Sequence, residues 1–268
     1  MFEATENVVD SPALAMRFHL NPWDEPTVGG CVATISSIAV HDNLRAATEF
    51  RRFTDWCEAN RVVLASCRIP HDCLDACGFL EARGFRFIEL NYRPQVADLH
   101  SVDLGGANGV VVAEAHASEE GQIAAIAGEI FEAGRFHADP LIDPAIGDLR
   151  YRKWVSNAFR NPAQRVLRCS ESGRLAAFFV VESPEPDRRF WSLVGMGPGL
   201  AGKGLGARMW RAMLRRHRDE GASKVSTSIS SHNVAVMNLY VKLGFRFPSP
   251  EITLHWCPRG RVSAPRPQ

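Results

Sequence analysis

Strand-like and helix-like hydrophobic patterns alternate along the chain. Residues 31–40 (CVATISSIAV) are apolar and rich in β-branched side chains, which predicts a strand. Residues 43–59 carry apolar side chains at helical spacing, and Asp42 is the expected N-cap of this helix. The next expected elements are a buried strand over 62–67, a helix from Pro70 to Gly84, and an alternating strand over 85–92.

The second half of the chain continues this alternation with more strands. Residues 109–114 predict a strand, and Ser118 is the expected cap of a helix that buries Ile123 and Ile130. Residues 135–145 contain two prolines and predict a loop. The remaining expected elements are a helix over 146–160, strands over 165–171, 174–182 and 190–196, a helix over 203–219, a strand over 223–229, a helix over 234–243 and a strand over 252–257.

A stretch without periodicity, residues 93–108, divides the two halves and is rich in turn-forming residues. We therefore expect one domain over 1–100, a second over 101–260 and a disordered tail over 261–268. Residues 79–92 and 239–256 both read as a helix end, then Gly-Phe-Arg-Phe, then a strand. This similarity is compatible with chance, or with two related half-folds of which the first has no glycine loop.

Charge and hydropathy exclude some partners. The net charge of +1 gives no bulk attraction to nucleic acid or to an anionic membrane. The N-terminus is acidic and lacks the pattern of a secretory signal, and the longest apolar run, Leu175 to Val181, is too short to cross a bilayer. We expect a cytoplasmic protein without nucleic-acid or membrane partners.

The cysteines suggest reduced thiols. Their number, seven, is odd, and most lie within strand-like or helix-like segments. Cys67, His71, Cys73 and Cys77 form a cluster, but their spacing matches no common zinc pattern. We therefore expect buried thiols and no metal.

A glycine-rich turn is the strongest chemical signal. Residues 190–209 (FWSLVGMGPGLAGKGLGARM) read as a strand, a turn and a helix, the setting in which backbone amides and the helix dipole bind phosphate. The sequence matches neither the dinucleotide-binding fingerprint nor the P-loop. The alternative is a glycine-rich turn with no ligand.

Two motifs resemble the GNAT superfamily of N-acetyltransferases. Residues 201–206 (AGKGLG) are similar to its acetyl-CoA motif, with Ala201 in place of the usual Arg or Gln. Residues 233–245 (NVAVMNLYVKLGF) are similar to its downstream signature, with Val236 in place of Ala. The resemblance covers about 109–257. It implies an α/β protein with the α+β GNAT fold, a mixed and mostly antiparallel sheet flanked by helices, preceded by a smaller degenerate GNAT-like half.

The resemblance also implies roles for individual residues. Acetyl-CoA, the co-substrate, would contact Val194, Met196, Ala201, Gly202, Lys203, Gly204, Leu205, Gly206, Ala207 and Asn233. An amine would attack the thioester directly, and Tyr240 would protonate the departing thiolate. The alternatives are a tyrosine that only packs on the sheet, and an Asn233 that only caps its helix. The strand before the loop has no carboxylate, so the base is open among Glu182, His137, Asp139, His232 and water.

The acceptor is suggested by a narrower likeness, to two-domain dTDP-fucosamine acetyltransferase-like enzymes. It rests on the two-part architecture, on residues 134–154 and on NPWDEPTVGG near the N-terminus. It implies that Arg135, Phe136, His137 and Asp139 line the pocket of a small amine, such as a nucleotide-linked amino sugar. The alternatives are a buried capping loop, transfer of a longer acyl chain to a natural-product or antibiotic amine, and a non-catalytic acetyl-CoA-binding module. The oligomeric state is open, with a homodimer among the options.

Overall fold

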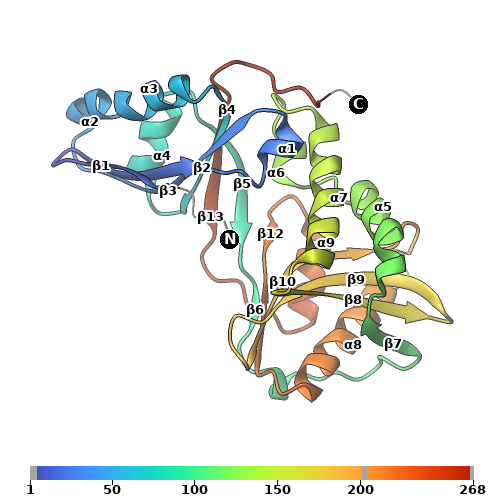
Figure 1. Cartoon of the computed structure of the whole chain (residues 1–268). Helices are drawn as coiled ribbons and strands as arrows, with labels where there is room; N and C mark the ends of the chain where they lie inside the picture. Colours follow the sequence, from blue (N-terminus) through green and yellow to red (C-terminus); the bar gives the residue numbers. More distant parts are fainter. Residues whose placement is uncertain (1–4, 201–203, 266–268) are drawn as a thin grey trace. The chain divides into compact units, whose positions relative to one another are not determined.

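The chain folds into two compact units, each assembled from separate stretches of sequence. The computed structural model describes residues 5–200 and 204–265. Unit 1 combines Met1–Asn91 with Gly134–Ile146 and Ser249–Gln268, and unit 2 combines Tyr92–Ala133 with Gly147–Pro248. The colours of Figure 1 show the interleaving, since the red C-terminal strand β13 lies among the blue strands. The units therefore do not follow the consecutive division into 1–100 and 101–260.

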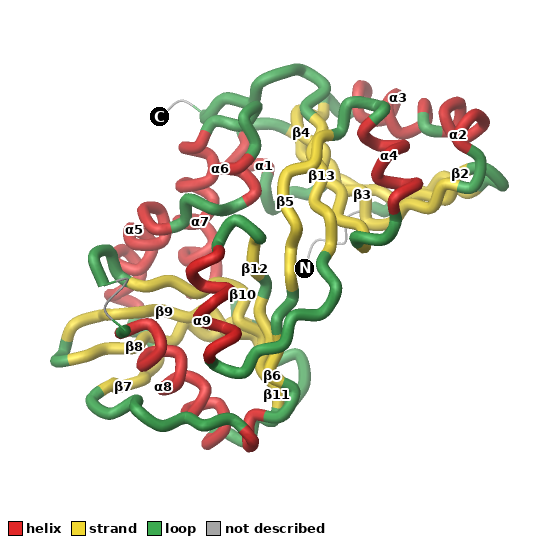
Figure 2. Tube along the Cα trace, turned by 180° about the vertical axis from the view of Figure 1, so that it is seen from behind, coloured by secondary structure: helices red, strands yellow, loops and turns green. Residues whose placement is uncertain are grey.

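The sheet of unit 1 has the order β1–β2–β3–β4–β13–β5. These strands are β1 (Asn7–Asp10), β2 (Leu14–Leu20), β3 (Cys31–Val40), β4 (Val62–Pro70), β5 (Arg86–Tyr92) and β13 (Glu251–Trp256). Strands β3 and β4 are parallel, as expected for a strand–helix–strand unit, and β13 runs antiparallel between β4 and β5. Figure 2 shows these last three strands side by side. The final strand of the chain thus completes the first sheet.

Both faces of this sheet are covered. Helices α2 (Asn43–Glu49), α3 (Arg51–Ala59) and α4 (Leu74–Glu81) supply an aromatic core that includes Phe50, Phe53 and Phe79. A second core contains Phe136 and Ile142 and lies with the short helices α1 (Glu25–Val28) and α6 (Arg135–Ala138). The predicted cap is confirmed, because the Asp42 carboxylate accepts hydrogen bonds from Leu44 N and Arg45 N at 3.0 and 3.1 Å.

The sheet of unit 2 has the order β6–β11–β10–β9–β8–β7. These strands are β6 (Gln95–Val96), β7 (Val110–Glu114), β8 (Gln164–Glu171), β9 (Arg174–Glu182), β10 (Arg188–Met196) and β11 (Lys224–Thr227), and the short β12 (Ile229–Ser230) follows β11. The pairs are antiparallel except for β10 with β11, which are parallel. The predicted mixed, mostly antiparallel sheet and the α/β fold class are confirmed.

Helices cover both faces of this second sheet. The helices are α5 (Glu120–Ile130), α7 (Pro144–Arg160), α8 (Leu205–Asp219) and α9 (Val234–Lys242). On β9, Phe178 and Val180 pack with α5 and α7, whereas Phe179 and Val181 pack with α8 and α9. Figure 1 shows α5 and α8 on opposite sides of β8 and β9. Burial on both faces explains why this strand is apolar without alternation.

Three local expectations differ from the structure. Residues 7–10 and 14–20 form strands that were not expected, although Leu14, Met16 and Phe18 alternate with less buried positions. Ser118 is not the helix cap. Glu119 is the N-cap of α5, and a 3₁₀ turn over Ala117–Glu119 precedes it. His116 caps this turn, since its Nδ1 accepts from Ser118 N at 3.3 Å and its amide donates to Glu119. The predicted loop over 135–145 contains α6 and the start of α7.

Two further expectations concern the cysteines and membrane-spanning helices. All seven cysteines lie in the described part of the chain and are free thiols. Burial raises the pKa of Cys57, Cys67 and Cys169 to about 12. Within residues 5–200 and 204–265, no helix combines the length and the apolar character that a bilayer crossing requires. The cytoplasmic location stays a prediction.

Candidate functional site

The parallel strands of unit 2 separate at one residue pair. Strand β10 pairs with β11 from Arg188 with Lys224 to Trp191 with Thr227, and β10 then continues to Met196 without β11. The Thr227 hydroxyl marks this point by donating to the Trp191 carbonyl at 2.8 Å. Strand β9 pairs with the other edge, opposite Val194 and Met196. Among the described residues, no strand pairs with this edge of β10 beyond Trp191, so the edge can form backbone hydrogen bonds with an extended ligand.

Helix α8 begins close to the end of β10. Gly204 is its N-cap and has φ 72°, a left-handed conformation that favours glycine. A side chain added at Gly204 would meet no described atom within 4 Å, so the space beside the helix start is open. Leu205, Gly206 and Ala207 form the first turn, whose amides lack partners inside the helix, and free amides of this kind can bind an anion. Ala201, Gly202 and Lys203 lie outside the described residues.

Gly206 brings three elements together. A Cβ atom built there would lie 3.2 Å from the Met196 sulfur and 3.4 Å from Cδ2 of Leu239. The end of β10, the start of α8 and helix α9 are therefore packed at this glycine. The open edge of β10 and the free amides of α8 are the two features that a pantetheine chain and a pyrophosphate require, so the described residues fit acetyl-CoA.

Tyr240 lies on α9 and is almost fully buried, with 2% of its surface exposed. Its ring packs against Phe245 at 4.8 Å between centroids. Burial raises the pKa of Tyr240 to about 12, whereas polar interactions with Trp210 and Thr227 act to lower it. The hydroxyl is therefore protonated at neutral pH, as a general acid must be.

Asn233 caps α9, because its Oδ1 accepts a hydrogen bond from Val236 N at 3.3 Å. This contact satisfies one of the free amides of the helix start. The cap fixes the first turn of the helix that carries Tyr240. A contact between Asn233 and the cofactor is compatible with this cap and stays a prediction.

Aromatic side chains of unit 2 gather near the same strand. A Cβ atom at Gly195 on β10 would clash with Ile130 at the end of α5. The next residue, Phe131, stacks on Tyr151 of α7 at 4.2 Å, and Tyr151 is parallel to Trp154 at 6.3 Å. These rings are partly exposed. Their flat apolar faces follow Ile130 in the sequence, and Ile130 packs against Gly195 in the part of β10 that has the open edge.

The loop expected to bind the acceptor is packed into unit 1. Arg135 forms an ion pair with Asp24 at 3.0 Å, and Phe136 is 2% exposed within an apolar core. Asp139 is 1% exposed and pairs with Arg86. His137 is partly exposed. Phe136 and Asp139 therefore stabilise unit 1 in this structure, and their role in binding an amine stays a prediction.

Asp139 is held by several donors. Its carboxylate contacts Arg86 Nη2 at 2.6 Å, His255 Nδ1 at 3.0 Å and Leu141 N at 2.9 Å. Although burial raises the pKa of Asp139, these hydrogen bonds outweigh it and the pKa is lowered overall. Burial lowers the pKa of His255 to about 4, so this ring is neutral at pH 7. A neutral histidine beside an ionised carboxylate is a stable buried arrangement.

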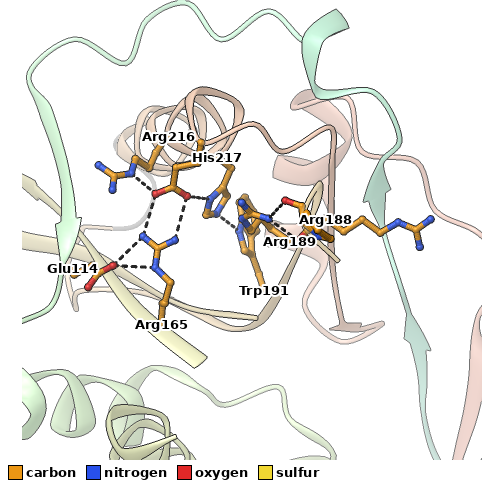
Figure 3. Close-up of polar contacts among 9 residues, drawn as sticks. Glu114, Arg165, Arg188, Arg189, Trp191, Arg216 and His217 are labelled. Atoms are coloured by element: carbon orange, nitrogen blue, oxygen red, sulfur yellow. Dashed lines mark hydrogen bonds and ion pairs between the residues drawn. The ribbon is translucent and has the colours of Figure 1, made fainter. Parts of the chain in front are cut away.

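A second polar network anchors the far end of α8, as Figure 3 shows. The Trp191 indole donates to His217 Nε2 at 3.0 Å, and His217 Nδ1 lies 3.5 Å from Glu220. Since an indole can only donate, His217 Nε2 is the acceptor and the ring is neutral. Arg165 binds Glu220 through two hydrogen bonds. Burial lowers the pKa of His217 to about 4, whereas the arginines outweigh the burial of Glu220 and lower its pKa to about 2.

The remaining candidates for the general base are Glu182 and His232. Glu182 pairs with Gln164 at 2.7 Å and stands opposite Phe190, near the start of β10 rather than its open end. His232 is exposed, and a role as the base stays a prediction for both residues. Within residues 5–200 and 204–265, no three His, Cys, Asp or Glu side chains form a group that could hold a metal ion.

Comparison with known proteins finds similarity to one family and to several solved structures. Residues 129–245 match the model of the acetyltransferase (GNAT) family. No curated protein matches the sequence. Among solved structures, a GCN5-related N-acetyltransferase from Kribbella flavida is 15% identical, with a TM-score of 0.60 over 94% of this chain and 89% of its own.

Two further structures share the fold. A tandem GNAT protein from the clavulanic acid biosynthesis pathway is 16% identical, with a TM-score of 0.57 over 92% of this chain and 81% of its own. A glucosamine N-acetyltransferase region of a fungal β-N-acetylglucosaminidase is 10% identical, with a TM-score of 0.64 over 91% of this chain and 31% of that longer chain. At these identities the similarity concerns the fold alone. The similarity to a tandem GNAT protein agrees with the expectation of two GNAT-like halves. The match over residues 129–245 covers less than half of the chain, and in that part the sequence is similar to the GNAT acetyltransferase family.

Proposed function

We propose that this protein transfers an acetyl group from acetyl-CoA to a primary amine of a small molecule. The observation that carries the proposal is the meeting of three features in unit 2. These are the open edge of β10 beyond Trp191, the glycine start of α8 at Gly204, and the buried, protonated Tyr240. Each supplies one requirement of acyl transfer from a thioester.

The reaction follows from these positions. The amides of Leu205, Gly206 and Ala207 bind the pyrophosphate, and the β10 edge at Val194 and Met196 hydrogen-bonds the pantetheine and the acetyl carbonyl. The amine attacks this carbonyl, so that a C–N bond forms and the C–S bond breaks. Tyr240 gives its proton to the leaving sulfur, and the proton of the attacking nitrogen leaves through water.

For the acceptor we propose an amino sugar, including nucleotide-linked forms. The partly exposed rings of Phe131, Tyr151 and Trp154 support this choice, because flat aromatic faces stack on sugars and bases. The fold is also shared with a glucosamine N-acetyltransferase region. In unit 1, Arg135 and His137 are not fully buried, and their contact with an acceptor stays a prediction.

A natural-product amine is the second candidate. The fold is shared with a tandem GNAT protein of the clavulanic acid pathway, which favours this candidate only at the level of architecture. A longer acyl chain would then be compatible with the same thioester chemistry.

Release of CoA thiol tests the proposal. Purified protein is mixed with acetyl-CoA and a panel of amines that includes glucosamine, nucleotide-linked amino sugars and aminoglycosides. We expect thiol release only when acetyl-CoA and an amine are both present. Tight acetyl-CoA binding without turnover on any amine would refute the enzyme and favour a regulatory acetyl-CoA-binding module. The amines that turn over separate the two candidate acceptor classes, and repeating the panel with propionyl-CoA and longer acyl-CoAs identifies the acyl chain.

A further inference from the structure

Thr227, the last residue of β11, is hydrogen-bonded on both sides of its strand. Its amide donates to the Pro94 carbonyl at 3.1 Å, and its hydroxyl donates to the Trp191 carbonyl of β10 at 2.8 Å. Trp191 is also its partner in the register of the parallel strands, and no pair follows it among the described residues. Thr227 is 2% exposed, so water does not compete for its hydroxyl. A side-chain hydrogen bond therefore fastens the two strands at the point where their pairing ends.

Strand β10 changes its course directly after this point. Its register with β9 shifts between Trp191 and Leu193, so Ser192 is an extra residue in β10. A β-bulge of this kind bends a strand and increases its twist. The Ser192 hydroxyl donates to the Val180 carbonyl at 3.3 Å, which holds the bulge to β9. The bend therefore begins one residue after the last pair with β11.

Trp191 is held in place by its own side chain. Its indole donates to His217 Nε2 at 3.0 Å (Figure 3). Its ring packs against Phe179 and Phe245, at 4.9 and 5.8 Å between centroids, and the residue has no exposed surface. Because Trp191 is fixed by this close packing, the hydrogen bond from Thr227 sets the position of the end of β11 relative to β10.

We propose that Thr227 is a positioning residue for acetyl-CoA, whose hydroxyl holds the end of β11 so that the edge of β10 from Ser192 to Met196 stays open to the pantetheine chain. The inference rests on the proposed function, since it concerns the edge that is assigned there to the cofactor. Backbone hydrogen bonds with this edge require a narrow range of distances and angles. A shift of the last residue of β11 would disturb them and leave the amides at the start of α8 unaffected.

The test compares two ligands that share the pyrophosphate. Acetyl-CoA carries the pantetheine arm, whereas 3′-phospho-ADP is CoA without this arm and lacks the part that would lie along β10. Isothermal titration calorimetry with the full chain measures both dissociation constants and requires neither an amine nor turnover. Thr227→Val keeps the shape and removes the hydroxyl, and Thr227→Ser keeps the hydroxyl. Thr253→Val is the matched control, because Thr253 is equally buried on a strand of the other unit.

We expect Thr227→Val to weaken acetyl-CoA binding about tenfold and to change the dissociation constant of 3′-phospho-ADP by less than about twofold. Thr227→Ser and Thr253→Val should bind acetyl-CoA as the original protein does. Unchanged acetyl-CoA binding in folded Thr227→Val, or equal losses for both ligands, would overturn the proposal. A Thr227→Ser protein as weak as Thr227→Val would also overturn it, because the loss would then follow the shape of the side chain and not its hydrogen bond.

A further variant decides the question if Thr227→Val does not fold. Thr227→Cys has a side chain of similar size and only a weak donor, so it should also weaken acetyl-CoA binding and leave 3′-phospho-ADP binding unchanged. Acetyl-CoA binding at the original strength in Thr227→Cys would then overturn the proposal.

The design separates this inference from the function beneath it. If the original protein and Thr227→Val bind acetyl-CoA equally well, the cofactor assignment stands and the role of Thr227 is wrong. If the original protein binds acetyl-CoA and Thr227→Val does so more weakly, but no amine is acetylated, the inference stands and the proposed catalysis is wrong. If the original protein binds neither ligand, the proposed function itself is wrong and the inference falls with it.

Discussion

Tyr240 is the residue whose chemistry the proposed reaction needs most. Its hydroxyl is buried, and its raised pKa keeps the proton available at all physiological pH values. We expect Tyr240→Phe to lower kcat about 100-fold, with a small change in KM for acetyl-CoA, because general acid catalysis contributes about that factor or more. Thiol release kinetics measures both constants.

Tyr92→Phe is the matched control for this change. Tyr92 contacts Phe247 through its ring and lies outside the proposed site. Its kcat should stay at the original value. Unaltered turnover in Tyr240→Phe would exclude Tyr240 from the mechanism, and equal losses in both variants would indicate a general effect on folding.

The sequence predicted Asp139 as a site residue but did not predict the buried partners of its carboxylate. Its partners Arg86 and His255 are distant along the chain, so no local pattern could reveal them. We expect Asp139→Ala to lower the free energy of unfolding by about 2 kcal/mol, less than a fully buried pair would lose because Arg86 is 33% exposed. Chemical denaturation measures this loss.

The exposed Asp10 of β1 supplies the comparison, since Asp10→Ala should change stability by less than about 0.5 kcal/mol. An Asp139→Ala protein with normal stability and abolished amine turnover would contradict the packing role. That outcome would restore Asp139 to the acceptor pocket.

At the scale of elements, the start of α8 depends on the left-handed Gly204. We expect Gly204→Ala to lower the free energy of unfolding by about 1 kcal/mol, because a left-handed conformation costs any L-residue. It should also raise KM for acetyl-CoA, since relaxing this strain moves the amides that bind the anion. Thermal unfolding and steady-state kinetics follow the two effects.

Gly121 provides the opposite case within the same unit. It lies inside α5 and has no neighbour within 4 Å of an added Cβ. Gly121→Ala should therefore stabilise the protein by up to about 1 kcal/mol and leave KM unchanged. Equal behaviour of the two alanine variants would show that the backbone at Gly204 does not shape the site.

The two Gly-Phe-Arg-Phe segments end their helices in the same way. In α4, Gly84 N bonds to Glu81 O and Phe85 N to Leu80 O, while in α9, Gly244 N bonds to Val241 O and Phe245 N to Tyr240 O. Both glycines have positive φ. The matching positions hold Leu80 in unit 1 and Tyr240 in unit 2. Unit 1 therefore has the same helix ending as unit 2 but carries no hydroxyl at the position that matches Tyr240.

Most elements could be predicted from sequence because their signals are local. The strand over 31–40 and the Asp42 cap agree with the structure, since alternation and capping act within a few residues. The predicted helix cap at Ser118 was wrong because a 3₁₀ turn capped by His116 precedes α5, whose N-cap is Glu119. Thr227 was missed because it belongs to no motif, and its position depends on where β10 and β11 part.

At the scale of the whole molecule, the pairing of strands could not be predicted. Strand β13 follows unit 2 in sequence but pairs with β4 and β5 of unit 1. Its pattern predicts a strand and says nothing about its partner. Each unit needs segments from distant parts of the chain, so we expect the halves cut at residue 100 to be incompletely folded when made separately.

Stability in acid should depend on one buried histidine in each unit. The pKa of His217 in unit 2 and of His255 in unit 1 is lowered by burial from 6.5 to about 4. The unfolded chain therefore binds more protons than the folded chain between these pH values, and stability falls as pH decreases from 6.5 to 4. A shift of this size corresponds to about 3 kcal/mol for each histidine, a large share of a typical folding free energy. Glu220 adds a loss at lower pH, between 4.5 and about 2.

We expect the free energy of unfolding, measured by urea titration, to be level near pH 7 and to fall steeply below pH 6. His217→Gln should flatten this fall, because glutamine can still accept from Trp191 and does not titrate. His19 on β2 is not buried, so His19→Gln should leave the curve unchanged. A stability that stays constant from pH 6.5 to 4 would mean that both rings are protonated without penalty, which is incompatible with their burial and with the indole donor that faces His217.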